Sequence, residues 1–224
     1  MALLEHLAQN PTVQPALERA TNAIEAVHRR PVNLRKVAIT SSESAVRGAK
    51  SASMLTGEDQ SICLKAYSVL APESVDTTAR TLRRAPLQVL ARIDVLAGGS
   101  GRPAEGKSEA AQSLAAVLSK QPHPGVIPAV AMAAIAGQEM FGQRSLLLGL
   151  VAARAAAIAF GFDPRGLCVP EPYYYRRQKQ CAALVRDALD STDAMANWIA
   201  FTCEAFEGGA KEAEGIAAVA AQTG

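Results

Sequence analysis

Between Pro11 and Pro31, apolar residues recur three or four positions apart, the spacing at which side chains share one face of an α-helix. Pro11 fits the first turn of a helix, where its missing N–H group costs nothing. Pro31 cannot continue the helix and marks its end. The pattern therefore predicts one amphipathic helix, whose core-facing residues are Val13, Leu17, Ala20, Ile24 and Val27.

Similar patterns predict helices along most of the remaining chain. Ser42 is a favourable start for a helix, and Gly57 is a favourable C-terminal cap for it. Gly208-Gly209 predicts a break between the last two helices. The predicted helices cover about residues 43–57, 61–70, 82–96, 109–120, 170–189, 192–206 and 208–222.

Two segments depart from the helical pattern. Residues 32–40 alternate β-branched and polar residues, which predicts a loop, with an extended connector or a short strand as the alternatives. The run Gly98-Gly99-Ser100-Gly101-Arg102-Pro103 is the strongest loop signal in the chain, and we expect at most a short hairpin near residues 98–106.

Two consecutive segments, 126–141 and 145–160, are apolar on nearly every face. A helix that is apolar all round is normally buried at the centre of a larger bundle. We therefore expect these two helices to form the core around which the other helices pack.

The composition favours an all-α protein with one domain. Half of the residues are apolar (49%) but only 4% are aromatic, so the core is built from Ala, Leu and Val, and Ala has the highest helix propensity. The net charge of +2 gives no electrostatic basis for nucleic-acid binding. The four cysteines are widely spaced, and we expect them to be buried free thiols, with no metal and no cofactor.

The chain shows no sign of a membrane segment. Residues 1–6 include an acid and a histidine where a signal peptide has basic and apolar residues. The longest apolar run, 146–160, is interrupted by Arg154 and is shorter than the ~20 residues that span a bilayer. We expect a cytoplasmic protein that contacts neither membrane nor nucleic acid.

Short motifs follow one another through the second half of the chain. His123-Pro124 precedes the first apolar helix, and residues 139–144 separate it from the second. Gly161-Phe162-Asp163-Pro164 ends the second helix, and Trp198-Ile199 lies on a later one. This order resembles the helical core of Fic-family (Fic/DOC-like) proteins, which transfer AMP or related phosphate groups onto protein hydroxyls. The stretches 84–92, 162–171 and 198–199 resemble an actinobacterial-type branch of that family.

The family's catalytic motif lies between the two apolar helices. It reads His-Pro-Phe, two variable residues, Gly-Asn-Gly-Arg, two more residues and Arg; the His takes the proton of the target hydroxyl, and the Gly-Asn-Gly-Arg turn binds phosphates. One register places Glu139 at the His and 144–147 at the turn. The other, anchored on Arg154 as the last Arg, places Gln143 at the His and 148–151 at the turn. Neither register keeps the His or the turn.

The resemblance also implies a domain organisation. Residues 52–57 resemble the family's inhibitory motif, with Ala52 in place of its hydroxyl residue and Thr56 in place of its Glu. The catalytic base and the inhibitory acid are thus both absent. We expect a single domain over 1–224, with an N-terminal helical extension over 1–57, a Fic-like core over 85–207 and a C-terminal helix over 208–224.

Five residues are the candidates for remaining chemistry. Glu139 is the candidate general base, against the alternative of a solvated or Arg-paired carboxylate. Gln143, Arg144 and Ser145 begin the second apolar helix and are candidates for anion binding, against the alternative of a capped surface loop. Arg154 lies alone among apolar residues, so we expect it to pair with Glu139, Glu171 or Asp163, and we also consider it for anion binding.

Glu171, Tyr173 and Tyr174 are candidates for contact with a protein, because Tyr is favoured at interfaces. Consecutive tyrosines on a helix face different directions, so at most one of them belongs to the core.

Three functional hypotheses follow. The preferred one is a Fic-fold protein that lacks the transferase motif and acts by binding another protein or by binding itself, for example as a homodimer. The second is a nucleotide-binding AMP or phosphate transferase with a rebuilt active site around Glu139, Arg144 and Arg154. The third is an unrelated helical regulator. The loop at 139–145 discriminates the first two: an open loop lined by donors favours the transferase, and a loop filled by Met140 and Phe141 favours the binding protein.

Overall fold

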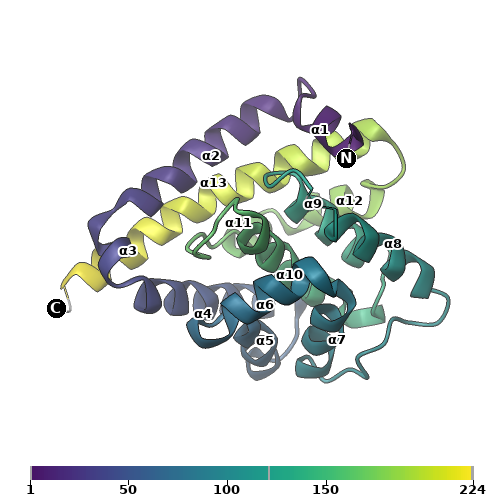
Figure 1. The fold of residues 1–224 in the computed structure, drawn as a ribbon, viewed down its shortest axis with the longest axis horizontal. Coiled ribbons are helices and arrows are strands. Elements are labelled where there is room, and N and C mark those ends of the chain that lie inside the picture. The colour runs from purple at the N-terminus through teal and green to yellow at the C-terminus, as the bar shows by residue number, and fades with distance from the viewer. Residues whose placement is uncertain (1, 121, 223–224) are drawn as a thin grey trace.

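The computed structural model describes residues 2–120 and 122–222, and every regular element in those ranges is a helix (Figure 1). The prediction of an all-α protein is confirmed. The α-helices are α1 (Ala2–Ala8), α2 (Gln14–Arg29), α3 (Pro31–Arg35), α4 (Val37–Thr56), α5 (Gln60–Tyr67), α6 (Pro72–Arg84), α7 (Pro86–Leu96), α8 (Ser108–Leu118), α9 (Ile127–Met132), α10 (Ser145–Phe160), α11 (Glu171–Arg176), α12 (Gln178–Asp187) and α13 (Thr192–Gln222).

Helices α9 and α10 form the centre of the molecule, as their all-round apolar pattern predicts. Ala129 of α9 accepts a hydrogen bond from the indole N–H of the buried Trp198 at 2.8 Å, which ties α13 to this centre. The first apolar helix is shorter than predicted: α9 ends at Met132, a π-helical segment follows over Ala133–Gly137, and a turn leads to α10. By length and composition Gly142–Phe160 is able to cross a membrane, but 78% of its apolar window is buried, as in a core helix of a soluble protein.

Helices α2 and α13 lie side by side along one edge of the molecule (Figure 1). Ion pairs join them at two places, Arg19 to Glu207 at 3.2 Å and Arg30 to Glu214 at 3.0 Å. The N-terminal and C-terminal segments of the chain are therefore packed against each other.

The predicted break at Gly208-Gly209 is wrong, because α13 continues through it to Gln222. Gly209 faces the backbone of Val169 and Pro170, and a Cβ atom there would come within 2.8 Å of their main-chain atoms. A hydrogen bond also joins the two segments, since the Val169 N–H donates to the Gly209 carbonyl at 3.2 Å. The glycine signals a close approach between two segments, which local sequence does not distinguish from a helix end.

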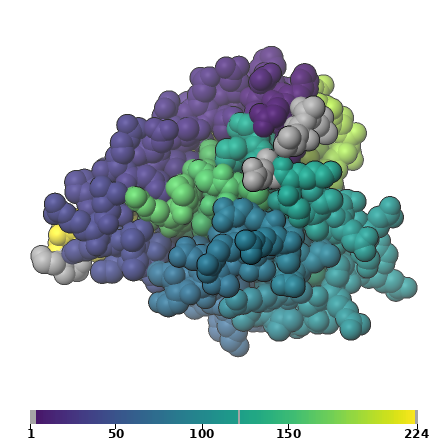
Figure 2. Space-filling model, in the orientation of Figure 1, coloured from purple at the N-terminus to yellow at the C-terminus, as the bar shows by residue number. Residues whose placement is uncertain are grey.

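The loop predicted over 32–40 is also wrong, since this segment forms α3 and the start of α4. Side chains satisfy the backbone around the junction: the Asn33 amide donates to the Val27 carbonyl at 2.9 Å, and the Ser41 hydroxyl donates to the Val37 carbonyl at 2.7 Å. The Lys36 ammonium donates to the Ala220 carbonyl, which draws the end of α13 to this corner, where the two segments adjoin at the tip of the molecule (Figure 2). Tertiary packing here overrides the β-branched pattern.

We expect Gly209→Ala to destabilise the protein although alanine favours a helix interior, because the added methyl meets backbone that has little freedom to move. The matched control is Gly215→Ala in the same helix, where nothing lies within 4 Å of the added Cβ. That control is expected to gain up to about 1 kcal/mol of stability from helix propensity. Urea unfolding measures both; equal and favourable effects at the two positions would contradict the close approach.

Candidate functional site

The predicted catalytic region is the turn between the π-helical segment and α10. A pocket of about 520 Å³ opens beside it. Its wall includes Glu139 of the turn, Leu55 at the end of α4, Leu146 at the start of α10, residues of the π-helical segment, and Lys179 and Arg186 of α12. The segment that resembles the family's inhibitory motif thus ends next to the turn that resembles its catalytic motif.

The start of α10 distinguishes the two registers of the motif. Helix α10 begins at Ser145, so the first register places residues 144–147, which it aligns with the family's phosphate turn, at a helix N-terminus. The second register places the turn at 148–151, which lies inside α10 and is buried. Phosphate-binding turns need accessible N–H groups at a helix start, so only the first register is compatible with the fold.

The turn uses its own backbone donors internally. The Met140 N–H donates to the Ile135 carbonyl at 2.9 Å, and the Gly142 N–H donates to the Glu139 carbonyl at 3.0 Å. The Phe141 N–H donates to the Ser145 hydroxyl at 2.8 Å. Ser145 is buried, so its hydroxyl closes the turn and does not face a ligand.

Side chains fill the interior of the turn. Met140 and Phe141 are buried, at 0% and 4% exposure. The Met140 carbonyl also accepts a hydrogen bond from the Ala104 N–H at 2.9 Å, which anchors the 98–106 segment to the turn. By the criterion stated from the sequence, a loop filled by these two residues favours the binding protein over the transferase.

Glu139 and Gln143 are both solvent-exposed. Glu139 has a φ angle of 50°, a left-handed conformation that costs a non-glycine residue roughly 1–2 kcal/mol. This conformation reverses the chain after the π-helical segment and leaves the carboxylate at the rim of the pocket.

Arg144 is held by an acid that the sequence reasoning missed. Its guanidinium donates to the Asp94 carboxylate at 2.8 Å, and Asp94 is fully buried. The other carboxylate oxygen of Asp94 accepts from the Gly101 N–H at 2.8 Å. The segment 98–106 is thus a turn pinned by Asp94, with no strand among the residues described there, and Arg144 is neutralised. A lone acid among the apolar positions of α7 was the available signal.

Arg154 is buried at 2% exposure and occupies a polar cluster. Its guanidinium donates to the Ser44 carbonyl at 3.1 Å, the Ser44 hydroxyl at 2.7 Å and the Gly166 carbonyl at 2.9 Å. It lies 3.6 Å from the Glu171 carboxylate, so of the three predicted partners Glu171 is the one it pairs with. These bonds commit the guanidinium to the fold, and the anion-binding role predicted for Arg154 is not supported.

Glu171 belongs to the same cluster. It is fully buried, and one carboxylate oxygen accepts a hydrogen bond from the Tyr67 hydroxyl at 2.8 Å. Burial raises the pKa of Glu171 above its ordinary value, while the nearby Arg154 opposes the shift. Gly48 on α4 makes the cluster possible, because a Cβ atom there would lie 2.6 Å from the Arg154 guanidinium.

The predicted interaction residues are mostly buried. Glu171 and Tyr174 are inaccessible, and Tyr174 stacks on Trp198 with ring centroids 6.2 Å apart. Both are core residues, and not the surface residues that the sequence predicts. Tyr173 is half-buried: its hydroxyl donates to Glu204 at 2.6 Å, and the Arg177 guanidinium lies 4.0 Å from its ring centroid. Only Tyr173 among the three offers any surface to a partner.

Asp163 and His28 form a pair that sequence reasoning also missed. The His28 imidazole lies 2.7 Å from the Asp163 carboxylate, which also accepts the N–H groups of Leu167 and Cys168 at 3.1 and 2.9 Å. His28 is half-buried. The pair fixes the turn after α10 against the end of α2.

The cysteines are buried and free, as predicted. Burial raises the pKa of Cys181, at the pocket beside Glu139, to about 12, so its thiol stays protonated and unreactive at neutral pH. Among residues 2–120 and 122–222, no three His, Cys, Asp or Glu side chains lie close enough to hold a metal ion.

No model of a known protein family matches the chain, and no curated protein matches it. The resemblance to the Fic family therefore stays a prediction based on the residues of the chain.

We expect Arg154→Met to lower the free energy of unfolding by about 3–5 kcal/mol, because it leaves Glu171 buried without its cation. Adding Glu171→Gln removes that uncompensated charge while keeping an acceptor for Tyr67, so the double variant should recover part of the loss. The control is Arg80→Met on the exposed face of α6, expected to change stability by less than about 0.5 kcal/mol. Additive effects of the two cluster substitutions would show that Arg154 and Glu171 are not coupled.

The raised pKa of Glu171 predicts a pH dependence of stability. The folded state holds the proton more tightly than the unfolded state, which releases it near 4.5. The protonated carboxyl therefore stabilises the fold fully below pH 4.5, and this contribution is lost as the pH rises through the folded-state pKa. Measured between pH 4 and 8, wild type should lose stability relative to Glu171→Gln; a gain with rising pH would show that Arg154 outweighs burial.

Proposed function

We propose that this chain is a Fic-fold protein without transferase activity, which acts in the cytoplasm by binding another protein or a second copy of itself. The observation that carries the proposal is the closed turn between the π-helical segment and α10. Its donors at Met140, Phe141 and Gly142 bond within the protein, and two of its side chains fill its interior.

Group transfer from a nucleotide requires features that the turn lacks. Phosphoryl-transfer catalysis depends on donors and cations aimed at the phosphate oxygens and on a base within hydrogen-bond reach of the acceptor hydroxyl. In this chain Arg144, which directly precedes α10, is bonded to Asp94, and no histidine occupies the turn. We therefore infer that the protein acts through contacts made by its surface.

We expect titration calorimetry of the purified chain with ATP at millimolar concentration to give no binding heat. We also expect no transfer of labelled phosphate or AMP onto protein. Sedimentation analysis over a range of concentrations tests self-association in the same preparation. Robust transfer from ATP that Glu139→Ala abolishes would overturn the proposal, since Glu139 is the candidate base.

A second candidate function is an AMP or phosphate transferase with a rebuilt site. The observation that favours it is the pocket of about 520 Å³ beside Glu139, whose wall includes Lys179 and Arg186 from α12. Arg186 already pairs with Asp187 at 2.7 Å, which leaves Lys179 as the cation for an anionic ligand. Nucleotide binding that Lys179→Glu abolishes and Lys65→Glu on α5 leaves unchanged would favour this candidate over the first.

A further inference from the structure

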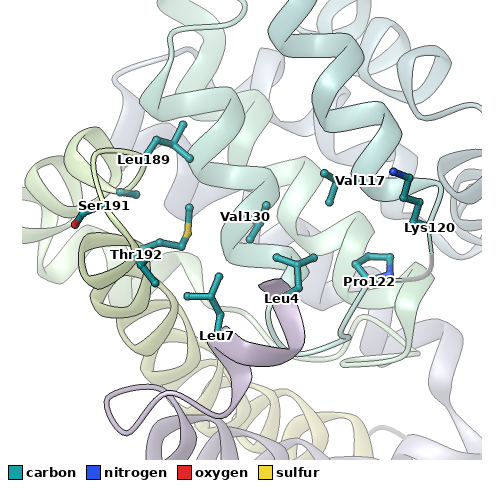
Figure 3. Close-up of a pocket in the computed structure, with 11 residues that line it drawn as sticks. Leu4, Leu7, Val117, Lys120, Pro122, Val130, Leu189, Ser191 and Thr192 are labelled. Carbon is teal, nitrogen blue, oxygen red and sulfur yellow. The ribbon is translucent and has the colours of Figure 1, made fainter. Parts of the chain in front are cut away.

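A second pocket lies away from the turn, where α1, α8, α9 and the start of α13 meet (Figure 3). Its volume of about 500 Å³ is within the range of roughly 300–1,000 Å³ found for small-molecule sites. The wall is almost entirely apolar, with Val130 of α9 near the centre of the view and Leu4 and Leu7 of α1 below it. This pocket shares no residue with the pocket beside Glu139.

The charged and polar groups of the pocket lie at its two ends. Lys120, after α8, stands at one end, and Ser191 and Thr192 stand at the opposite end (Figure 3). Lys120 is exposed and makes no salt bridge with any residue that the structure describes. The far end is unfavourable for an anion, because Asp190 and Asp193 directly flank Ser191 and Thr192 in the chain.

We propose that this pocket binds a straight-chain carboxylate, an amphiphile with one anionic headgroup and an apolar tail. The headgroup lies at Lys120, and the tail extends along Val130 toward Met195 and Leu189. A wall of Leu, Val and Met side chains supplies no polar group to hold a polar tail, so apolar burial supplies the affinity and the single cation sets the orientation.

The tail and the headgroup make separate contributions that calorimetry distinguishes. Each buried methylene strengthens binding roughly fourfold, so dodecanoate should bind about 15-fold more tightly than decanoate. Undecyltrimethylammonium has the same alkyl tail as dodecanoate with a cationic headgroup, and it should bind more weakly than dodecanoate. All three probes are used below the concentrations at which they form micelles, with the full-length chain.

Variants of the chain test the site itself. Val130→Trp fills the pocket and should abolish dodecanoate binding; Leu189→Asp, at a side chain that is 45% exposed and therefore tolerant, should weaken it at least tenfold. Lys120→Glu should weaken dodecanoate and strengthen the trimethylammonium probe. The matched control, Lys65→Glu on α5, changes charge equally at an exposed lysine outside the pocket and should leave both affinities unchanged.

The proposal fails if dodecanoate shows no saturable binding, if binding survives both Val130→Trp and Leu189→Asp, or if Lys120→Glu has no more effect than Lys65→Glu. It also fails if the pocket is a protein interface, which would appear as self-association that Leu189→Asp abolishes without any carboxylate binding. That last outcome supports the proposed function of the chain while overturning this inference, so the two are distinguishable.

Discussion

The fold depends on one buried cation, the guanidinium of Arg154. Removing a charge from water is costly, so the protein must surround Arg154 with acceptors. It does so with Ser44 from α4, Gly166 from the turn after α10, and Glu171 from the start of α11. A single side chain therefore fixes the relative positions of segments separated by more than 100 residues of sequence. The Arg154 cluster lies within the core, and its demand for acceptors limits how α4, α10 and α11 are able to move.

Two other buried carboxylates apply the same constraint elsewhere. Asp94 holds Arg144 and the Gly101 turn, and Asp163 holds His28 and the N–H groups that follow α10. In each case a buried carboxylate accepts hydrogen bonds from backbone N–H groups in a turn, which have no partner within a helix. The candidate catalytic turn is closed in this way. Its cation is neutralised from α7 and its interior is filled by Met140 and Phe141. The apolar pocket beside Lys120 is open by contrast, with a cation that makes no salt bridge among the described residues.

The sequence predicted the helical class and the central position of α9 and α10, because all-round apolar helices have only the interior in which to lie. It also identified Arg154 as a residue that needs a partner and included Glu171 among three choices. It failed where a local signal has two physical causes. The pair Gly208-Gly209 is typical of a helix end, but in the structure the helix continues and Gly209 allows the backbone of another segment to approach closely. The β-branched run at 32–40 led to the prediction of a loop, but the segment is helical and packs against the end of α13.

For this protein, the sequence by itself determined which residues are apolar, where helices are favoured, and that the catalytic histidine and glycines of the resembled motif are missing. These properties are local and depend on residue type and spacing. Only the tertiary structure decided that Asp94 neutralises Arg144, that Glu171 and Tyr174 are core residues, and that Lys120 faces an apolar pocket. Such pairings join residues far apart in the chain, and their energies depend on burial and distance, which no periodicity along the sequence encodes.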